Sequence, residues 1–227
     1  MPTRKKYGKR KKDDDDSGSE ECNNPFMNKF IKKVKGWSND RSDSDVYTRG
    51  NHIVFKGDVN RDNVYKLGEE LETLNKEFRD LQKSLDAVIC TPKPIYLHLN
   101  TYGGYLDDAW AAVDFIKSSK IPVHTIVEGR VASAGTLMSV VGQKRYMTPH
   151  SRFLIHQLRG GMWGKFADME ESLEECKDAM DDIVDLYLEH TNMTEKQIRD
   201  QLKKEKYWDI DACKRKGFID EVWKNDL

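Results

Sequence analysis

A serine among small residues is the first candidate for chemistry. Ser133 lies in the stretch GRVASAGT, where an apolar segment gives way to a helical pattern. Its small neighbours leave room for a substrate carbonyl, and a serine at the start of a helix can point its hydroxyl group into a cleft. The same position also suits a serine that caps the helix by satisfying an orphan backbone amide. Taken alone, this stretch favours the capping role.

His156 is the second candidate. It ends the apolar stretch SRFLIHQ, which predicts a strand, and a neutral imidazole there could accept the proton of a serine hydroxyl group. The chain has six histidines, so one histidine alone indicates little. His98, for example, lies in the apolar stretch PIYLHLN and is interpreted as a hydrogen-bonded core residue.

The pair Gly103–Gly104 is the third candidate, because it follows an apolar stretch and precedes a helical pattern. Glycines let the backbone come close to a ligand and leave amide N–H groups free near a helix N-terminus. Such a pair is more often only a turn. The sequence GGYLDD also lacks the GxGxxG pattern of dinucleotide-binding sites.

Alternating strand and helix patterns would position these residues. Short apolar runs predict strands at 51–57, 94–100, 121–129, 145–149 and 152–157. Apolar residues at steps of three and four predict helices over 64–88, 106–116, 132–142 and 166–188. The stretch 205–223 has the pattern of a helix, a turn at Gly217 and a short strand. This alternation predicts an α/β fold with crossover connections.

Composition limits the class of protein. The 227 residues allow one domain with a full core, and the net charge of -1 gives no general attraction to nucleic acid. No window approaches the ~20 apolar residues of a membrane span. Four scattered cysteines indicate reduced thiols, and the basic start runs into Asp13–Asp16 rather than into a signal sequence. We expect a soluble, cytoplasmic protein.

The first 44 residues differ from the rest of the chain. They combine a basic run, an acidic run and a polar stretch, so residues 1–44 are predicted to be a disordered charged tail before a domain over 45–227. The run KKYGKRKK could be a nucleic-acid or nuclear-import patch. Because the adjacent acidic block can neutralise it, a solvated tail is the preferred interpretation.

The stretches NTYGG, ASAGT and SRFLIHQ resemble, in order and context, the motifs of the ATP-dependent Clp protease proteolytic subunit family. DVYTRGNHIVFKGDV is similar to that family's start of domain, and HQLRGGMWGKFADME to its handle strand entering the handle helix. EHTNMTEKQI and ACKRKGFID are similar to its C-terminal segment, so the resemblance covers roughly residues 45–223. It implies a ClpP/crotonase-like spiral of ββα units with a protruding handle helix.

The resemblance assigns a role to each candidate residue. It implies that Ser133 is the nucleophile and His156 the general base of a serine endopeptidase. The backbone amides of Gly104 and Ala134 would form the oxyanion hole, where two N–H donors stabilise the charge of an acyl-transfer transition state. No metal or organic cofactor is implied.

The third triad member is where the sequence departs most from the family. The family's aspartate falls on Glu205, and a glutamate can orient the histidine equally well. Asp200 and Asp209 are nearby competitors. Two further departures are Tyr102 in place of proline and Ala134 in place of methionine. Position 134 contributes only backbone, whereas Tyr102 is expected to alter the substrate groove.

The resemblance also implies partners. Two stacked heptameric rings, joined through the handle helices, would enclose a chamber that unfolded polypeptides enter, with an AAA+ unfoldase as a further partner. The apolar stripe along 166–188 suits such packing, although a monomer core would explain it equally well. A viral capsid-maturation peptidase of the same fold also fits the sequence.

Two other functions remain open. A non-catalytic ring subunit would scaffold active partners, but it would normally have lost the serine or the histidine. A crotonase-type enzyme acting on acyl-CoA esters would share the fold and the oxyanion hole, but its chemistry uses carboxylates rather than a serine–histidine pair. Thioester hydrolysis or binding to immobilised CoA would discriminate it.

Overall fold

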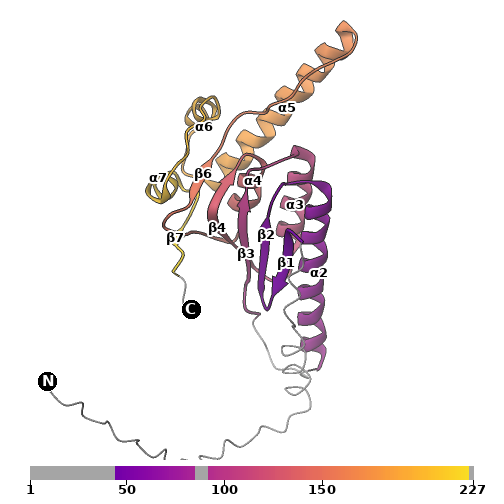
Figure 1. Cartoon of the computed structure of the whole chain (residues 1–227), viewed down its shortest axis with the longest axis vertical. Coiled ribbons are helices and arrows are strands. Elements are labelled where there is room, and N and C mark those ends of the chain that lie inside the picture. The colour runs from indigo at the N-terminus through magenta and orange to yellow at the C-terminus, as the bar shows by residue number, and fades with distance from the viewer. Residues whose placement is uncertain (1–43, 85–91, 225–227) are drawn as a thin grey trace, which may run out of the picture. The chain divides into compact units, whose positions relative to one another are not determined.

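The computed structural model describes residues 44–84 and 92–224, which form a mixed α/β domain (Figure 1). Its strands are β1 (Val46–Arg49), β2 (His52–Lys56), β3 (Ile95–Thr101), β4 (Val123–Ala132), β5 (Lys144–Met147), β6 (Arg152–Leu154) and β7 (Glu221–Val222). Its helices are α2 (Arg61–Ser84), α3 (Leu106–Ser118), α4 (Ala134–Val140), α5 (Phe166–His190), α6 (Glu195–Leu202) and α7 (Ile210–Lys216). The predicted tail, apart from Ser44, and the end of the helix predicted over 64–88 lie outside the described residues.

The strands form one sheet in the order β1-β2-β3-β4-β5-β7, and β6 pairs with β4. Only β1 and β2 are antiparallel; the other pairings are parallel. The long strand β4 pairs with β5 over His124–Val127 and then with β6 over Arg130–Ala132. The C-terminal end of β4 is therefore flanked by β6. The parallel pairings confirm the predicted α/β fold with crossover connections.

Helices cover the apolar face of the sheet. α2 and α3 pack side by side against it, and α4 contacts α3, β3 and β4 (Figure 1). The side chain of Asn75 is buried in α2 and joins it to the end of α3. Its amide oxygen accepts hydrogen bonds from the backbone N–H groups of Lys120 and Ile121, and its Nδ2 donates to Ser119 Oγ over 3.0 Å. The Asn75 side chain thus provides hydrogen-bond partners for the polar groups of the connection that follows α3.

Helix α5 is packed over only part of its length. Its buried residues, Ile183, Val184, Leu186 and Tyr187, all lie in its C-terminal half. Figure 1 shows its N-terminal part extending beyond the other elements. In that part Phe166 is 75% exposed and Leu173 46% exposed. The monomer core therefore does not account for the beginning of the apolar stripe.

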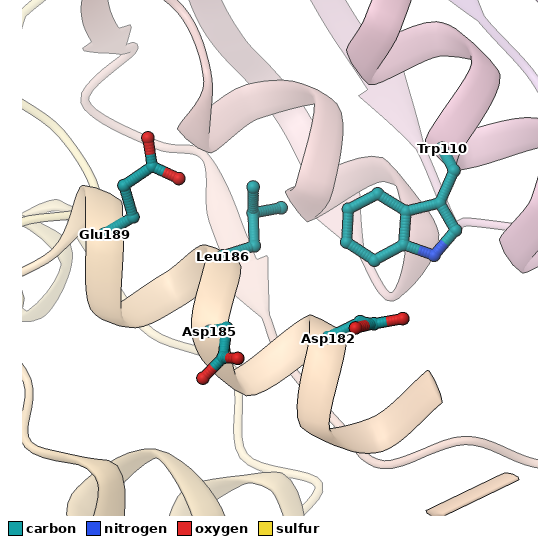
Figure 2. Close-up of a pocket in the computed structure, with 5 residues that line it drawn as sticks. All are labelled: Trp110, Asp182, Asp185, Leu186 and Glu189. Atoms are coloured by element: carbon teal, nitrogen blue, oxygen red, sulfur yellow. The ribbon is translucent and has the colours of Figure 1, made fainter. Parts of the chain in front are cut away.

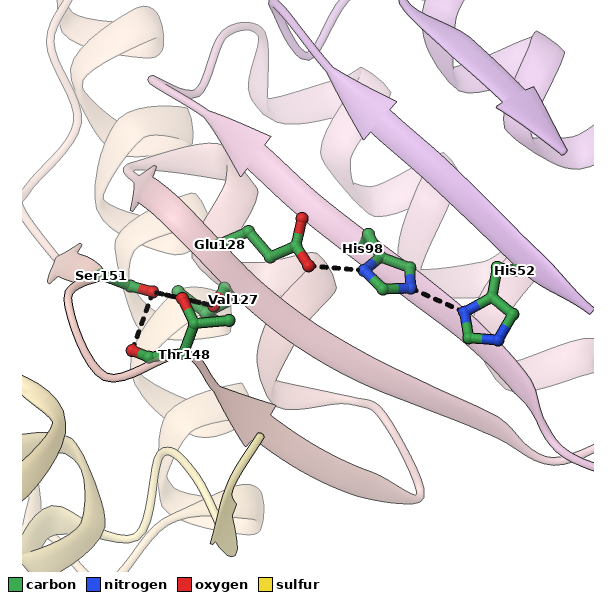
Figure 3. Close-up of polar contacts among 6 residues, drawn as sticks. All are labelled: His52, His98, Val127, Glu128, Thr148 and Ser151. Carbon is green, nitrogen blue, oxygen red and sulfur yellow. Dashed lines mark hydrogen bonds and ion pairs between the residues drawn. The ribbon is translucent and has the colours of Figure 1, made fainter. Parts of the chain in front are cut away.

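The other face of the sheet carries a row of polar and aromatic side chains. His52 Nδ1 lies 2.8 Å from His98 Nε2, and His98 Nδ1 lies 2.7 Å from a carboxylate oxygen of Glu128 (Figure 3). The row links β2, β3 and β4, and Tyr96 stacks on the ring of His52. His98 is therefore hydrogen bonded, as predicted, but it is half-buried on this face of the sheet and does not belong to the core. Figure 3 also shows the hydroxyl groups of Thr148 and Ser151 in contact beside the carbonyl of Val127.

Three histidines make the stability of the fold depend on pH. Burial lowers the pKa of His52, His124 and His190, and the neighbouring His98 lowers that of His52 further. The folded chain therefore binds protons less readily than the unfolded chain, so the free energy of unfolding falls as the pH drops below about 6.5. We expect a lower urea midpoint at pH 5 than at pH 7, and a smaller drop in a His124→Gln variant. An equal midpoint at both pH values would contradict the prediction.

Two elements were not predicted, and several are shorter than predicted. Strand β1 and helix α6 are additional, and β6 ends at Leu154 rather than at residue 157. Helix α6 had a sequence signal, because Thr194 accepts a hydrogen bond from Gln197 N and the Gln197 side chain bonds back to Thr194 N. This is a capping box in the sequence TEKQ. No helix in residues 44–84 and 92–224 combines the length and the apolar character that a membrane crossing requires.

Candidate active site

Ser133 occupies a sharp turn between β4 and α4. Its backbone angles are φ 54° and ψ −131°, and it is the only non-glycine residue with a positive φ in the described part of the chain. Its N–H donates to the carbonyl of Leu154 in β6 over 2.9 Å. The Ser133 side chain makes no capping hydrogen bond, so the capping role is wrong. A strained strand-to-helix turn of this kind presents a serine hydroxyl group above the end of a sheet.

The peptide group after Ser133 is held from its carbonyl side. Thr136 donates to the Ser133 carbonyl from its backbone N over 2.9 Å and from its hydroxyl group over 2.5 Å. The hydroxyl group of Tyr187, on α5, lies 2.7 Å from that of Thr136. Complete burial raises the pKa of Tyr187 well above its usual value, so this phenol stays protonated. With the carbonyl fixed, the N–H of Ala134 at the other end of the peptide group has a fixed direction.

The glycine turn packs directly against the nucleophile. Gly103 has φ +103°, and a Cβ on it would lie 2.6 Å from Ser133 Cβ. Val59 holds the turn by donating to Gly103 O over 2.9 Å and accepting from Tyr105 N over 2.8 Å. A Cβ on Gly104 would overlap the Val59 carbonyl. Glycine is therefore required at both positions, since only glycine combines this backbone with so close an approach.

The two candidate oxyanion donors are unoccupied. Within the described residues, neither Gly104 N nor Ala134 N donates a hydrogen bond, whereas Gly103 N donates to Thr101 Oγ1 over 3.0 Å. Ala134 begins α4, and the first amides of a helix have no partner within the helix. Both N–H groups are thus available to an oxygen atom in the pocket.

His156 lies just beyond β6 and not within it. Its Nδ1 lies 2.6 Å from the carbonyl oxygen of Gln157. Because a carbonyl oxygen can only accept, this contact places the proton of a neutral imidazole on Nδ1 and leaves Nε2 as the acceptor. That is the tautomer a general base needs. In the described part of the chain, no hydrogen bond joins Ser133 to His156 through their side chains.

One pocket of about 340 Å³ gathers four of the five predicted site residues. Ser133, His156, Gly104 and Ala134 all line it. The remaining lining residues come from the glycine turn, from α4, from the segment after β6 and from α5: Tyr102, Tyr105, Leu106, Leu137, Gln157, Leu158, Arg159, Ile183 and Tyr187. The structure thus brings together four segments that are separated in the sequence.

Glu205, the fifth predicted residue, lies in a segment that runs beside His156. Gln157 N donates to Leu202 O over 2.7 Å, and Phe153 and Trp208 exchange two backbone hydrogen bonds in an antiparallel bridge. These contacts place residues 202–208 alongside 153–157, with Glu205 near the middle of the pairing. The Glu205 carboxylate contacts the guanidinium of Arg159, which lines the pocket, and does not contact His156.

The two competing carboxylates have other partners. Asp200 pairs with Lys196 on the surface of α6 over 2.7 Å, and that contact lowers the pKa of Asp200. Asp209 caps α7 by accepting from Ala212 N over 2.9 Å. Neither residue belongs to the segment between Leu202 and Trp208, so the geometry favours Glu205 among the three.

A second hollow, of about 380 Å³, lies between α3 and α5 (Figure 2). The indole of Trp110 faces Leu186, and Asp182, Asp185 and Glu189 surround them. Its lining contains carboxylates but no serine, cysteine or histidine, so it lacks the serine–histidine pair of the first pocket. The described residues contain no group of three or more His, Cys, Asp or Glu side chains placed to hold a metal ion.

Sequence reasoning missed the residues that support the site. Thr136, Tyr187 and Arg159 gave no signal, because their roles depend on contacts between α4, α5 and the segments that follow β6 and α6. In the comparison with protein families, the model described as Clp protease matches residues 52–226. The matched region includes every predicted site residue.

Proposed function

The chain belongs to the Clp protease family, and from this premise we propose that it is a serine endopeptidase that acts through Ser133, His156 and Glu205. Family membership supports a peptidase activity. The roles of individual residues rest on the pocket. The observation that carries the proposal is the sharp turn that presents Ser133 in one pocket with His156 and two free backbone amides.

The reaction would proceed through an acyl-enzyme. His156 Nε2 takes the proton of the Ser133 hydroxyl group as its oxygen attacks the scissile carbonyl carbon. The carbonyl oxygen becomes an oxyanion and accepts hydrogen bonds from Gly104 N and Ala134 N. The imidazolium then gives its proton to the departing amine as the C–N bond breaks. Water, activated by the same imidazole, hydrolyses the ester in a second round.

Glu205 would orient the histidine and stabilise its charged form. For this, one Glu205 oxygen replaces the Gln157 carbonyl as the acceptor of the His156 Nδ1 proton. The backbone pairing supports this role, because Glu205 lies between Leu202, which pairs with Gln157, and Trp208, which pairs with Phe153. For Glu205 to reach the histidine, its ion pair with Arg159 must open. Both side chains are more than half exposed, and exposed ion pairs contribute at most about 1 kcal/mol to stability.

Labelling with a fluorophosphonate probe tests the proposal. The full chain is treated with the probe, and peptide mapping locates the adduct. We expect one adduct per chain at Ser133, and none in Ser133→Ala or His156→Ala. No adduct in a folded assembly would favour the non-catalytic scaffold, and hydrolysis of acyl-CoA thioesters instead of peptides would favour the crotonase-type reaction.

We further propose the assembly that the family generally forms, stacked heptameric rings that receive unfolded polypeptides from an AAA+ unfoldase. A cytoplasmic location belongs to the same proposal. The supporting observation is the exposed apolar surface at the start of α5 and just before it. Trp163 is 99% exposed and Phe166 75% exposed, and Met169 and Leu173 continue the same helical face. Surfaces of this kind mark contact sites.

Charge on this surface should separate the rings. We expect a Phe166→Glu/Leu173→Glu variant to sediment with about half the mass of the unchanged assembly, because two desolvated carboxylates at a helix contact disfavour burial. Glu175 lies on the opposite side of the helix, so Glu175→Ala serves as the matched control and should keep the full mass. Sedimentation velocity measures the outcome, and a charged variant of unaltered mass would show that this surface does not join the rings.

Loss of the Thr136–Tyr187 contact should weaken catalysis without weakening substrate binding. We expect Tyr187→Phe or Thr136→Val to lower kcat by about 3- to 10-fold, because the lost hydrogen bond is worth about 0.5–1.5 kcal/mol and the Ala134 amide loses its fixed direction. KM should stay within about twofold, since the contact does not touch the substrate. Thr136→Ser keeps the hydroxyl group and should retain kcat. A change confined to KM would contradict this role.

A further inference from the structure

Two arginines stand side by side at the edge of the candidate active site. Arg130 on β4 and Arg152 on β6 are direct partners in the parallel register of the two strands. Such partners lie about 4.8 Å apart and point to the same face of the sheet. Arg130 is three residues before Ser133, and Arg152 is four residues before His156. Two like charges in this arrangement repel each other unless an anion lies between or over them.

The Arg130 guanidinium contacts two tyrosine rings. Its central carbon lies 5.1 Å from the centre of the Tyr102 ring and 4.8 Å from the centre of the Tyr207 ring. Tyr102 lines the pocket that contains Ser133, and Tyr207 follows Glu205 by two residues. The two rings therefore fix the guanidinium at the rim of the pocket. Within residues 44–84 and 92–224 the guanidinium N–H groups of Arg130 donate no hydrogen bond, so they remain free to bind an anion.

Both arginines lack a carboxylate partner. Among residues 44–84 and 92–224, no carboxylate lies within ion-pair distance of either guanidinium, and the Arg152 Nη1 donates only to the carbonyl of Ser151, over 2.9 Å. By contrast, Arg145 pairs with Asp220, and Arg199 pairs with two carboxylates. The chain has 39 acidic and 38 basic residues, so carboxylates are not scarce. Both guanidinium groups are therefore open to an anion that comes from outside the described residues.

We propose that Arg130 and Arg152 form a subsite for a carboxylate side chain, Asp or Glu, of the polypeptide substrate. The proposal rests on the peptidase function proposed above. A planar guanidinium held by stacking can bind a carboxylate through two parallel hydrogen bonds, and Arg152 adds a second positive charge. The shared Tyr102 connects the subsite to the reactive serine, so an acidic residue bound there lies a short distance along the chain from the scissile bond.

Matched pairs of peptides test the subsite on the full chain. A fluorogenic peptide is made in a series with one Asp placed in turn at each position around the scissile bond, and each member is paired with its Asn analogue. We expect one position at which Asp raises kcat/KM over Asn by roughly 10-fold, since charge-assisted hydrogen bonds exceed neutral ones. Arg130→Gln should reduce that ratio to about one while leaving the Asn peptide within a few-fold of its original rate. Arg130→Lys should give an intermediate ratio.

A control arginine and two contrary results complete the design. Arg49, stacked on the single ring of Tyr47 in the distant strand β1, is the matched control, and Arg49→Gln should keep the full ratio. No preference for Asp in the original chain would overturn the proposal. An equal loss for Asp and Asn peptides in Arg130→Gln would also overturn it, because Arg130 would then only brace the pocket.

Peptide binding separates this proposal from the peptidase function. Fluorescence anisotropy with a Ser133→Ala chain should show tighter binding of the Asp peptide than of the Asn peptide, and Arg130→Gln should remove the difference. Selective binding without any cleavage by the unaltered chain would refute the peptidase function and support the subsite. Cleavage without a preference for the Asp peptide in either assay would support the peptidase function and refute the subsite.

Discussion

A Ser133→Ala chain is expected to lose about 10⁶-fold in kcat for an internally quenched unfolded polypeptide. His156→Ala should lose a similar factor. Because the serine and the histidine act as a unit, the double variant should be no worse than either single one. Steady-state cleavage with the full assembly measures all three. The result depends on the shared pocket that contains both side chains.

Ser139 provides the matched control for this prediction. It lies in α4 and is buried, and its hydroxyl group has no hydrogen-bond partner among the described residues. Ser139→Ala therefore removes a serine hydroxyl group from the same helix without removing a contact, and it should keep full activity. A Ser133→Ala chain that retained more than about a hundredth of the original rate would exclude Ser133 as the nucleophile.

Because the backbone at Ser133 is strained, the free energy of unfolding of Ser133 variants also tests this site. A non-glycine residue in this backbone conformation costs on the order of 1–3 kcal/mol. We therefore expect Ser133→Gly to be inactive and yet harder to unfold than Ser133→Ala. Equal stability of the two variants would show that the turn is relaxed.

Loss of the acid is the second large effect. Glu205→Gln should lower kcat by about 10⁴-fold, because an amide can leave the histidine in the wrong tautomer and cannot stabilise its charged form. The substitution leaves the backbone pairing of Leu202 and Trp208 intact, so the fold should not change. The comparison with kcat of the unaltered chain, at saturating substrate, gives the effect directly.

Two aspartates serve as controls for this assignment. Asp200→Asn loses only an exposed contact to Lys196, and Asp209→Asn keeps a residue type that caps helices equally well. Both variants should stay within a few-fold of the original activity. If Asp200→Asn or Asp209→Asn were the inactive variant and Glu205→Gln were not, the third member of the triad would have to be reassigned.

The sequence was sufficient for the elements whose patterns are local. Periodicity predicted α2, α3 and α5, and apolar runs predicted β2 to β6, because burial against one sheet face imposes these repeats. Strand β1 escaped because VYTR is short and only its first residue is fully buried. Strand β6 ends early because the chain beyond Leu154 pairs instead with the segment after α6.

The residues that line the candidate pocket were predictable where short stretches of sequence carry the signal. Ser133, His156 and the glycine turn could therefore be identified from short stretches. Contacts between distant segments could not be identified in this way. The Thr136–Tyr187 hydrogen bond spans 51 residues and the Arg159–Glu205 pair spans 46, so neither leaves a local pattern. The same holds for the stacking of Arg130 between two tyrosines.

The order of the segments along the chain has a consequence during synthesis. Glu205 and the backbone partner of Phe153 are made about 50 residues after His156. At roughly 5–20 residues per second, the ribosome would need about 2–10 s to supply them. During that interval the nascent chain would carry Ser133 and His156 without the segment that pairs beside them and without the acid proposed to orient the histidine. Under the proposed mechanism, the emerging chain and its neighbours on the same messenger RNA would therefore be protected from cleavage.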